Sequence, residues 1–199
     1  MKLLLATNNA HKREEMEAIL KQVIPDAEVV SIANVYPEGI DVEETGETLE
    51  ENAYLKAKTL YDITGLPTIA DDTGLEVDAL NGQPGVRTAR FAGENATYQD
   101  NVNLTLEKLQ GVPVEKRSAK FRTVICFCSD VRTIFAEGVC EGRIAEAASG
   151  TAGFGYDPIF LPTGSTRTFA EMESGEKHEL SHRGRALREF ATLLEQYNQ

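Results

Sequence analysis

The sequence predicts an α/β protein in which helices flank a mixed β-sheet, with two lobes around a central cleft. In the first half, short apolar strands alternate with segments whose apolar residues recur at helical spacing, as in α/β folds. In the second half, Ala119–Cys128 and Thr133–Ile144 are rich in β-branched and aromatic residues, and a hairpin turn fits between them. No repeat, low-complexity tract or change in composition marks a linker, so residues 1–199 are expected to form one domain.

The apolar pattern of the first half gives its elements in order. Lys2–Ala6 is an apolar strand, and the helix after it has Met16 and Leu20 on one buried stripe. Thr48 and Glu51 have the spacing of a capping box and predict the start of a second helix. Two further strands are expected at Val29–Ile32 and Thr68–Ala70, and two loops at Asn34–Glu47 and Asn81–Gly93.

Three more elements complete the second half. Thr97 opens a helix that ends before Gly111 and Pro113. Tyr156–Pro162 is expected to form a strand. The last helix runs from about Ser181 to Tyr197 and carries an apolar face, as helical periodicity requires.

Composition excludes several classes of protein. The net charge of −12 argues against a general nucleic-acid binder, which needs basic surface to displace counterions. No apolar run approaches the roughly 18 residues needed to span a bilayer, and nothing resembles a signal peptide. The odd count of three cysteines, two of them in an apolar stretch, predicts buried reduced thiols and fits the cytoplasm.

A polar turn after the first strand suits a phosphate group. A helix that follows a strand leaves its first N–H groups free to attract an anion, and Lys12 adds a positive charge. The alternative is an ordinary N-cap with an exposed lysine, because asparagine is a common capping residue. The residues of this turn are Thr7, Asn8, Asn9, Ala10, His11 and Lys12.

An acidic pair suits Mg²⁺, which prefers carboxylate and phosphate oxygens. Asp71 and Asp72 are expected at the carboxyl end of a strand, where α/β sheets place ligands. Adjacent strand residues point to opposite faces, so one aspartate is expected to face the metal, with Glu43 or Glu44 adding a carboxylate. An aspartate here is also suited to accept a proton from an attacking water. The alternative is a turn, because Asp-Asp-Thr-Gly is good turn chemistry.

The last third contains groups suited to a nucleobase. Gly150–Pro158 combines three glycines with two aromatic residues, which allows close approach and stacking. The alternative is a loop whose aromatic residues fill the core. Lys177 adds a cation, and His182 and Arg183 can donate hydrogen bonds to a ring carbonyl, which would discriminate against an exocyclic amine.

A zinc-protease pattern is also present. His178–His182 matches H-E-x-x-H, which requires both histidines on one helical face. Ser181 is expected to be an N-cap and would interrupt such a helix, so this interpretation is disfavoured.

Taken together, the motifs resemble the inosine/xanthosine triphosphate pyrophosphatase family over almost the whole chain. The matching segments are Thr7–Lys12, Glu43–Gly46, Glu51–Ala53, Ala70–Leu75, Gly85–Phe91, Phe154–Pro158 and Ser181–Arg183. The resemblance implies an elongated mixed sheet with helices on its faces, a homodimer, Mg²⁺, and hydrolysis of ITP, dITP and XTP to the nucleoside monophosphate and pyrophosphate.

The resemblance also implies roles for individual residues. Glu43 and Asp72 would hold the metal, Asp72 would accept the proton, and Thr73 and the turn Thr7–Lys12 would contact the substrate. The remaining substrate-binding residues implied in this way are Phe154, Gly155, Tyr156, Asp157, Lys177, His182 and Arg183.

Two rival hypotheses belong to other functional classes. One is a non-catalytic nucleotide sensor, which has little need of two carboxylates near the phosphates. The other is a Mg²⁺-dependent phosphatase acting on sugar phosphates or pyrimidine nucleotides, which would not release pyrophosphate.

Overall fold

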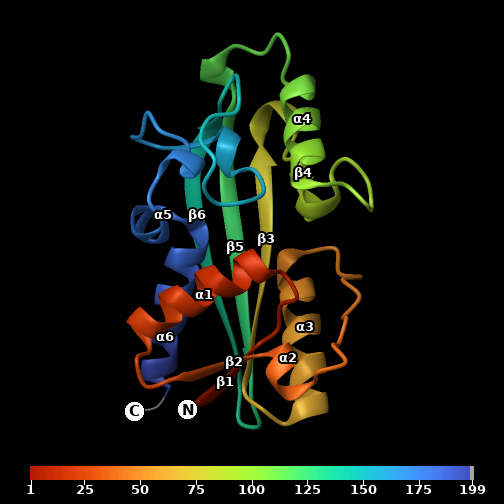
Figure 1. The fold of residues 1–199 in the computed structure, drawn as a ribbon, viewed down its shortest axis with the longest axis vertical. Coiled ribbons are helices and arrows are strands. Elements are labelled where there is room, and N and C mark those ends of the chain that lie inside the picture. Colours follow the sequence, from red (N-terminus) through yellow and green to blue (C-terminus); the bar gives the residue numbers. More distant parts are fainter. Residues whose placement is uncertain (198–199) are drawn as a thin grey trace. The chain divides into compact units, whose positions relative to one another are not determined.

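The computed structural model describes residues 1–197 and contains the mixed sheet flanked by helices that the sequence predicts (Figure 1). The strand order is β2-β1-β3-β5-β6-β7, and β4 pairs with β3 off this path. β1 pairs in parallel with β2 and β3, whereas β3–β4 and β6–β7 are antiparallel. The strands are β1 Lys2–Leu5, β2 Glu28–Ser31, β3 Thr68–Val77, β4 Pro84–Gly85, β5 Ser118–Cys128, β6 Thr133–Ile144 and β7 Phe160–Pro162.

Six α-helices and several short 3₁₀ turns occur in the described residues. The helices are α1 Ala10–Val23, α2 Ile32–Val35, α3 Leu49–Thr64, α4 Tyr98–Lys108, α5 Ser174–Leu180 and α6 His182–Gln196. None of the helices in residues 1–197 has the length and apolar character needed to cross a membrane.

The chain divides into two units. Unit 1 comprises Met1–Asp72, Thr123–Gly138 and the described residues from His182 onward. Unit 2 comprises Thr73–Arg122 and Val139–Ser181. Three of the four boundaries fall within β3, β5 and β6, so each of these strands contributes residues to both units, and the fourth falls between α5 and α6.

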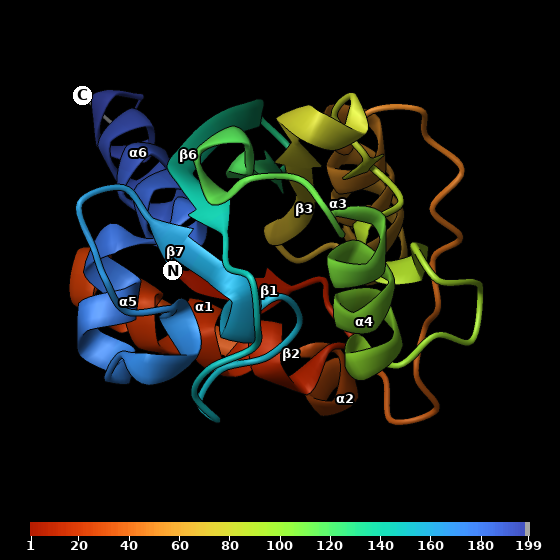
Figure 2. The ribbon, with the colours of Figure 1, turned by 90° about the horizontal axis from the view of Figure 1, so that it is seen from above.

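Unit 1 packs two helices on one side of its strands and a third on the other. In Figures 1 and 2, α1 and α6 lie together on one side of β3, and α3 lies on the opposite side. The core beneath α1 and α6 includes Leu5, Met16, Ile69 and Phe190, all fully or almost fully buried. The stripe predicted for the first helix is therefore confirmed, and burial of these apolar side chains is the main stabilising term.

Unit 2 has a core rich in phenylalanine. The ring centroid of Phe160 lies 4.7 Å from that of Phe121 and 5.1 Å from that of Phe169. Tilted pairs at these separations add about 0.5–1.5 kcal/mol each beyond their buried area. This core anchors the segment between β6 and α5, which carries several of the predicted base-binding residues.

One prediction about the acidic pair is wrong. Asp71 and Asp72 were expected at the end of a short strand, but β3 continues through them to Val77. Leu75 and Val77 are both fully buried in the core of unit 2, so burial favours the extended backbone over a turn. The pair therefore lies inside a strand, and the alternative interpretation as a turn is also wrong.

Smaller differences concern the ends of elements. The side chain of Thr48 caps α3 as predicted, but the Glu51 carboxylate accepts from the N–H of Glu47, so the capping box is incomplete. The strand expected at Tyr156–Pro162 is shortened by a 3₁₀ turn at Asp157–Ile159, which contains a proline. The short helices α2 and α5 were not predicted.

The cysteine prediction is confirmed. Cys126, Cys128 and Cys140 are free thiols, and all three are buried. Cys126 and Cys128 lie on the same face of β5 with their sulfur atoms 3.9 Å apart. They pack as small apolar side chains in the sheet.

Candidate functional site

Two adjacent buried aspartates form the centre of the candidate site in unit 1. Asp71 is 1% exposed and Asp72 is 6% exposed. Because side chains alternate along a strand, Asp71 contacts residues of α1 and α6 and Asp72 contacts residues of α3. The prediction that the two carboxylates point in opposite directions is confirmed.

Asp71 is surrounded by positive charge. The Nζ of Lys12 lies 3.0 Å from its Oδ2, and Arg183 donates to the same oxygen from Nη2 at 3.1 Å and from Nε at 3.4 Å. Burial alone would raise the pKa of Asp71, but the charges of Lys12 and Arg183 outweigh it and hold the pKa far below its usual range. Asp71 is therefore ionised at any physiological pH.

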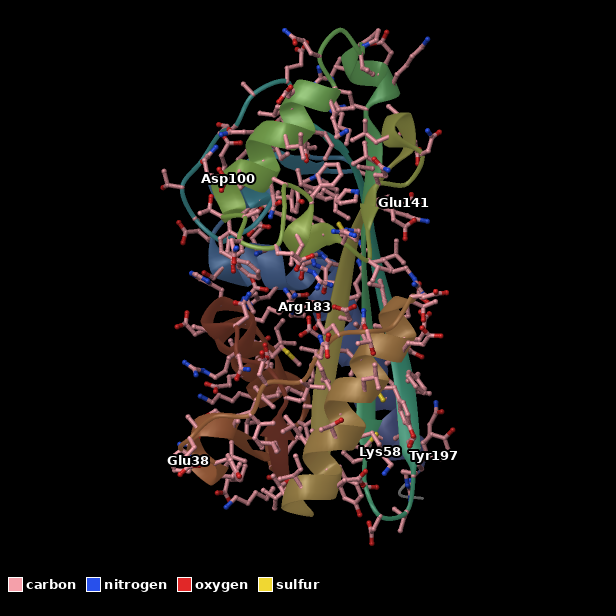
Figure 3. The ribbon with its side chains drawn as sticks, turned by 90° about the vertical axis from the view of Figure 1, so that its right-hand side faces the viewer. Glu38, Lys58, Asp100, Glu141, Arg183 and Tyr197 are labelled. Carbon is pink, nitrogen blue, oxygen red and sulfur yellow. The ribbon has the colours of Figure 1, made fainter. Side chains whose placement is uncertain are left out.

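A second carboxylate completes the surroundings of Arg183. Nη1 of Arg183 donates to Oε2 of Glu15 at 2.6 Å. Arg183 is 2% exposed, whereas Glu38 is exposed, and both are labelled in Figure 3. Burial would lower the pKa of Arg183, but the charges of Asp71 and Glu15 outweigh burial and raise the pKa above its usual value. The guanidinium is therefore always charged, and its two carboxylate partners fix its orientation. Glu15 was not expected in the site, although it lies one helical turn after Lys12.

The turn before α1 has the geometry of a side-chain cap. The Oδ1 of Asn9 accepts from the N–H of Lys12 at 3.2 Å, and the N–H of Asn9 donates to Oγ1 of Thr7 at 3.2 Å. Asn8 donates through Nδ2 to the carbonyl of Ile40 at 3.1 Å, which ties the turn to the loop between α2 and α3, called the acidic loop because it contains Glu43 and Glu44. The alternative of an exposed lysine is wrong, because the Lys12 side chain is only 18% exposed and pairs with Asp71.

Asp72 lies in a different electrostatic environment. Its Oδ2 accepts from Nδ2 of Asn52 at 3.2 Å, and its Oδ1 lies 3.5 Å from Nζ of Lys56. Lys56 also pairs closely with Oε1 of Glu44. Burial raises the pKa of Asp72, and the charge of Lys56 offsets only part of this effect. A carboxyl whose pKa is raised in this way is a better proton acceptor than an ordinary aspartate.

The acidic loop presents Glu44 to this group. Glu43, the residue chosen from the family resemblance, is exposed, and the contact with Lys56 is made by its neighbour Glu44. Glu44 and Asp72 thus meet one ammonium group, and both supply the oxygen donors that Mg²⁺ uses. Within residues 1–197, no cluster of three or more His, Cys, Asp or Glu side chains is arranged to hold a metal.

Unit 2 contains a second polar group, centred on Asp157. Lys177 and Asp157 are both about 5% exposed and form an ion pair with 2.6 Å between Nζ and Oδ2. The N–H of Phe154 donates to the same oxygen at 2.8 Å. Gly153 has a φ of +72°, and a Cβ added there would lie 2.0 Å from Oδ2 of Asp157, so the loop requires glycine at this position.

The two aromatic residues of this loop differ in exposure. Nζ of Lys177 lies 5.0 Å from the ring centroid of Phe154, which is partly exposed, whereas Tyr156 is 4% exposed. The hydroxyl of Tyr156 donates to the carbonyl of Thr88 at 2.8 Å, and burial raises the pKa of the phenol. Tyr156 therefore packs in the core of unit 2, as the alternative interpretation of this loop expected, and Phe154 offers the accessible ring.

Close packing positions the start of α6. A Cβ added to Gly138 on β6 would lie 2.1 Å from the carbonyl oxygen of His182 and 2.4 Å from the N–H nitrogen of Ala186. The first turn of α6 therefore rests directly on β6, which places Arg183 against Asp71. Sequence reasoning did not detect the importance of Gly138, because a glycine in a strand gives no indication of its partner.

The zinc-protease interpretation is wrong. His178 lies on α5, and His182 is the first residue of α6. Ser181 between them has φ −70° and ψ 155°, which is extended backbone. The single helix that H-E-x-x-H requires is therefore interrupted between the two histidines.

The chain is similar to known proteins over almost its whole length. The model of the Ham1 family matches residues 3–193. A protein of Thermoanaerobacter sp. (strain X514) called dITP/XTP pyrophosphatase is 48% identical over 196 residues, covering 98% of this chain and 96% of that protein. One of the same name from Bacillus licheniformis is 44% identical and covers 98% of both chains. The solved structure of the Staphylococcus aureus Ham1 protein has a TM-score of 0.86 and 38% identity, covering 99% of this chain and 100% of its own.

Proposed function

The chain belongs to the Ham1 family, and from this premise we propose that it hydrolyses the deaminated purine nucleoside triphosphates ITP, dITP and XTP. The products are the nucleoside monophosphate and pyrophosphate, so the reaction removes these nucleotides from the pool. The observation that carries the proposal is the aspartate pair on β3. One carboxylate is locked between cations, and the other is buried with a raised pKa beside Lys56 and the acidic loop.

Asp72 is the proposed proton acceptor. Its raised pKa and its contact with Lys56 suit a carboxylate that takes a proton from the attacking water. The water oxygen forms a bond to the phosphorus of the α-phosphate, the bond from that phosphorus to the α–β bridging oxygen breaks, and pyrophosphate leaves with that oxygen. Asp71 does not suit this role, because its lowered pKa makes it a poor base.

We propose Mg²⁺ as the cofactor, held by Asp72 and a carboxylate of the acidic loop. The family resemblance indicates Glu43, and the contact with Lys56 adds Glu44 as a candidate. Mg²⁺ usually takes one or two carboxylates and completes its shell with water and substrate phosphates, which fits two carboxylates without a third protein ligand. When bound, it neutralises charge on the phosphates and polarises the attacked phosphorus.

The turn Thr7–Lys12 is the proposed site for the triphosphate. It lies at the positive end of the dipole of α1, a helix of 14 residues, and carries the charge of Lys12. Lys12 is paired with Asp71, so its ammonium group is already positioned. Thr73 directly follows the metal-binding aspartate and is proposed to contact the substrate as well.

Base recognition is proposed for the residues that the family resemblance indicates. We propose that Phe154 stacks on the purine and that Gly155, Tyr156, Asp157 and Lys177 shape its surroundings. His182 and Arg183 are proposed to select the 6-oxo group of inosine and xanthosine, because N–H donors can bond a ring carbonyl but not an exocyclic amine at that position. The carboxylates of Asp71 and Glu15 hold Arg183 in one orientation, which favours such selection.

The proposal also covers the partners, the oligomeric state and the cellular location of the enzyme. The net charge of −12 disfavours nucleic acid as a partner, and a homodimer in the cytoplasm is the expected state.

A panel of nucleoside triphosphates with Mg²⁺, read out by pyrophosphate formation, tests the function. ITP, dITP and XTP should give pyrophosphate much faster than ATP, and Asp72→Asn should remove most of this turnover while leaving the fold intact. Release of single phosphates would indicate a phosphatase of another type. Binding of nucleotide without turnover would indicate a sensor.

A further inference from the structure

Asn52 is a buried polar residue that the proposed mechanism does not use. It lies in the first turns of α3 and is 1% exposed, so its amide must find partners inside the protein. Its Oδ1 accepts from the N–H of Gly46 at 2.8 Å, and its Nδ2 donates to Oδ2 of Asp72 at 3.2 Å. One side chain therefore links the acidic loop to the proposed proton acceptor.

The orientation of this amide follows from its partners. The N–H of Gly46 can only donate, so the oxygen of Asn52 must face it and the nitrogen must face Asp72. The carboxylate of Asp72 can only accept while it is ionised, which agrees with this orientation. No rotation of the amide satisfies both neighbours in any other way.

Gly46 allows the loop to approach this closely. A Cβ added at Gly46 would lie 2.7 Å from Oδ1 of Asn52, 2.7 Å from Cβ of Glu51 and 3.0 Å from the backbone nitrogen of Asn52. Any side chain there would push the loop away from α3. Glycine at position 46 therefore serves the close contact with Asn52.

Asn52 and Lys56 lie one helical turn apart and act on the two oxygens of Asp72. Asn52 donates to Oδ2, and Lys56 faces Oδ1 at 3.5 Å. The same two residues also hold the acidic loop, Asn52 through Gly46 and Lys56 through Glu44. This face of α3 thus sets the separation between the loop carboxylates and Asp72.

We propose that Asn52 is a positioning residue, which fixes the acidic loop and Asp72 at the separation needed to bind one divalent cation. The inference rests on the proposed function and names no new ligand of the metal. Asn52 acts through Gly46 and Asp72 and touches neither metal nor substrate. Removing a residue that hydrogen-bonds to a metal ligand, without binding the metal itself, typically lowers metal affinity or activity by about 10–100-fold.

The variant Asn52→Leu tests the inference, because leucine has a similar shape and forms no hydrogen bond. We expect the Mg²⁺ concentration for half-maximal pyrophosphate release from ITP to rise about 10–100-fold. At saturating Mg²⁺, the KM for ITP should change much less, because the proposed phosphate and base contacts are intact. A second readout is the binding of Mn²⁺ in the presence of inorganic pyrophosphate, followed by electron paramagnetic resonance, which should weaken by a similar factor.

Asn101 provides a matched control. It is 2% exposed, accepts from the N–H of Ala92 at 2.8 Å and donates to the carbonyl of Ala89 at 3.0 Å. Asn101→Leu removes the same two kinds of bond from unit 2, and its Mg²⁺ requirement should stay as in the wild type. An equal rise in the Mg²⁺ requirement of both variants would mean that general destabilisation causes the effect, and it would overturn the proposal.

Gly46→Ala is the second test, needed if Asn52→Leu fails to fold. It displaces the loop without removing the Asn52 amide, and it should raise the Mg²⁺ requirement in the same direction. A folded variant of either kind with the wild-type Mg²⁺ requirement would overturn the inference. If the wild type itself releases no pyrophosphate or needs no divalent cation, the proposed function fails first and the inference fails with it.

Discussion

The two aspartates of β3 should respond in opposite ways when each is changed to asparagine. Asp71→Asn removes the counter-ion of both Lys12 and Arg183 and leaves two cations in the interior. Breaking a buried pair costs about 3–5 kcal/mol, and we expect the lower end because Glu15 still holds Arg183 at 2.6 Å. With about 2–4 °C per kcal/mol for a chain of this size, the melting temperature should fall by about 6–12 °C.

Asp72→Asn is the matched control, because it makes the same chemical change at the next residue. The pKa of Asp72 is raised mainly by burial, so its charged form destabilises the fold at neutral pH. Asparagine removes this charge, and Glu44 still pairs with Lys56. We expect the melting temperature to stay the same or to rise slightly, even though turnover is lost.

The stabilities of the two variants should also depend on pH in opposite directions. A lowered pKa in the folded state means that Asp71 stabilises the protein above its unfolded pKa of about 3.9, and this is lost as pH falls. The difference in the free energy of unfolding between the wild type and Asp71→Asn should therefore become smaller below about pH 5. The raised pKa of Asp72 has the opposite sign, so the relative stability of Asp72→Asn should increase from acid to neutral pH.

Thermal and urea unfolding, followed by circular dichroism from about pH 2 to pH 8, measure these differences, because most of the loss expected for Asp71 falls below pH 4. Equal destabilisation by both substitutions would refute the reasoning, because it would mean that the charges around each aspartate do not matter. A stability gap for Asp71→Asn that does not depend on pH would refute the assignment of the effect to its ion pairs.

Two further predictions concern the proposed base-binding residues. Arg183→Ala should reduce the preference for ITP over ATP. It should also destabilise the fold by about 3 kcal/mol, the lower end for breaking a buried pair, because Asp71 and the partly exposed Glu15 lose this partner while Asp71 keeps Lys12. An unchanged ratio of the two rates, measured where the variant is folded, would remove Arg183 from base selection. Gly153→Ala should displace Asp157 and raise the KM for ITP. Gly164→Ala is its control, since Gly164 has a similar φ of +84° with nothing within 4 Å of an added Cβ and lies outside the proposed site, and equal effects would assign the loss to backbone strain.

Much of the fold could be predicted from the sequence, because local patterns determine it. β5 and β6 agree with the predicted strands to within one residue, and the apolar stripe of the first helix is buried as expected. The error in β3 has a physical cause. Asp-Asp-Thr-Gly is favourable in a turn, but Leu75 and Val77 lie in the core of unit 2 and keep the strand extended.

The partners of the acidic residues could not be predicted in the same way. Asp71 and Arg183 are 112 residues apart in sequence, and no local pattern relates them. The choice between Glu43 and Glu44 depends on the path of an irregular loop, which Asn52 fixes through Gly46. The spacing of Asn52 and Lys56 on one helical face was visible, but only the fold shows that this face meets Asp72.

The opposite environments of the two aspartates also explain why they are adjacent. A strand sends successive side chains to opposite faces, so one short segment of β3 reaches α1 and α6 with Asp71 and α3 with Asp72. The ion pairs of Asp71 hold this segment of the strand in place, which limits the movement of the carboxylate at the next position. The chemistry proposed for Asp72 needs a carboxylate that is both buried and fixed, and burial alone raises its pKa without fixing its orientation. Loss of the Asp71 ion pairs should therefore lower turnover as well as stability, even though Asp71 takes no proton.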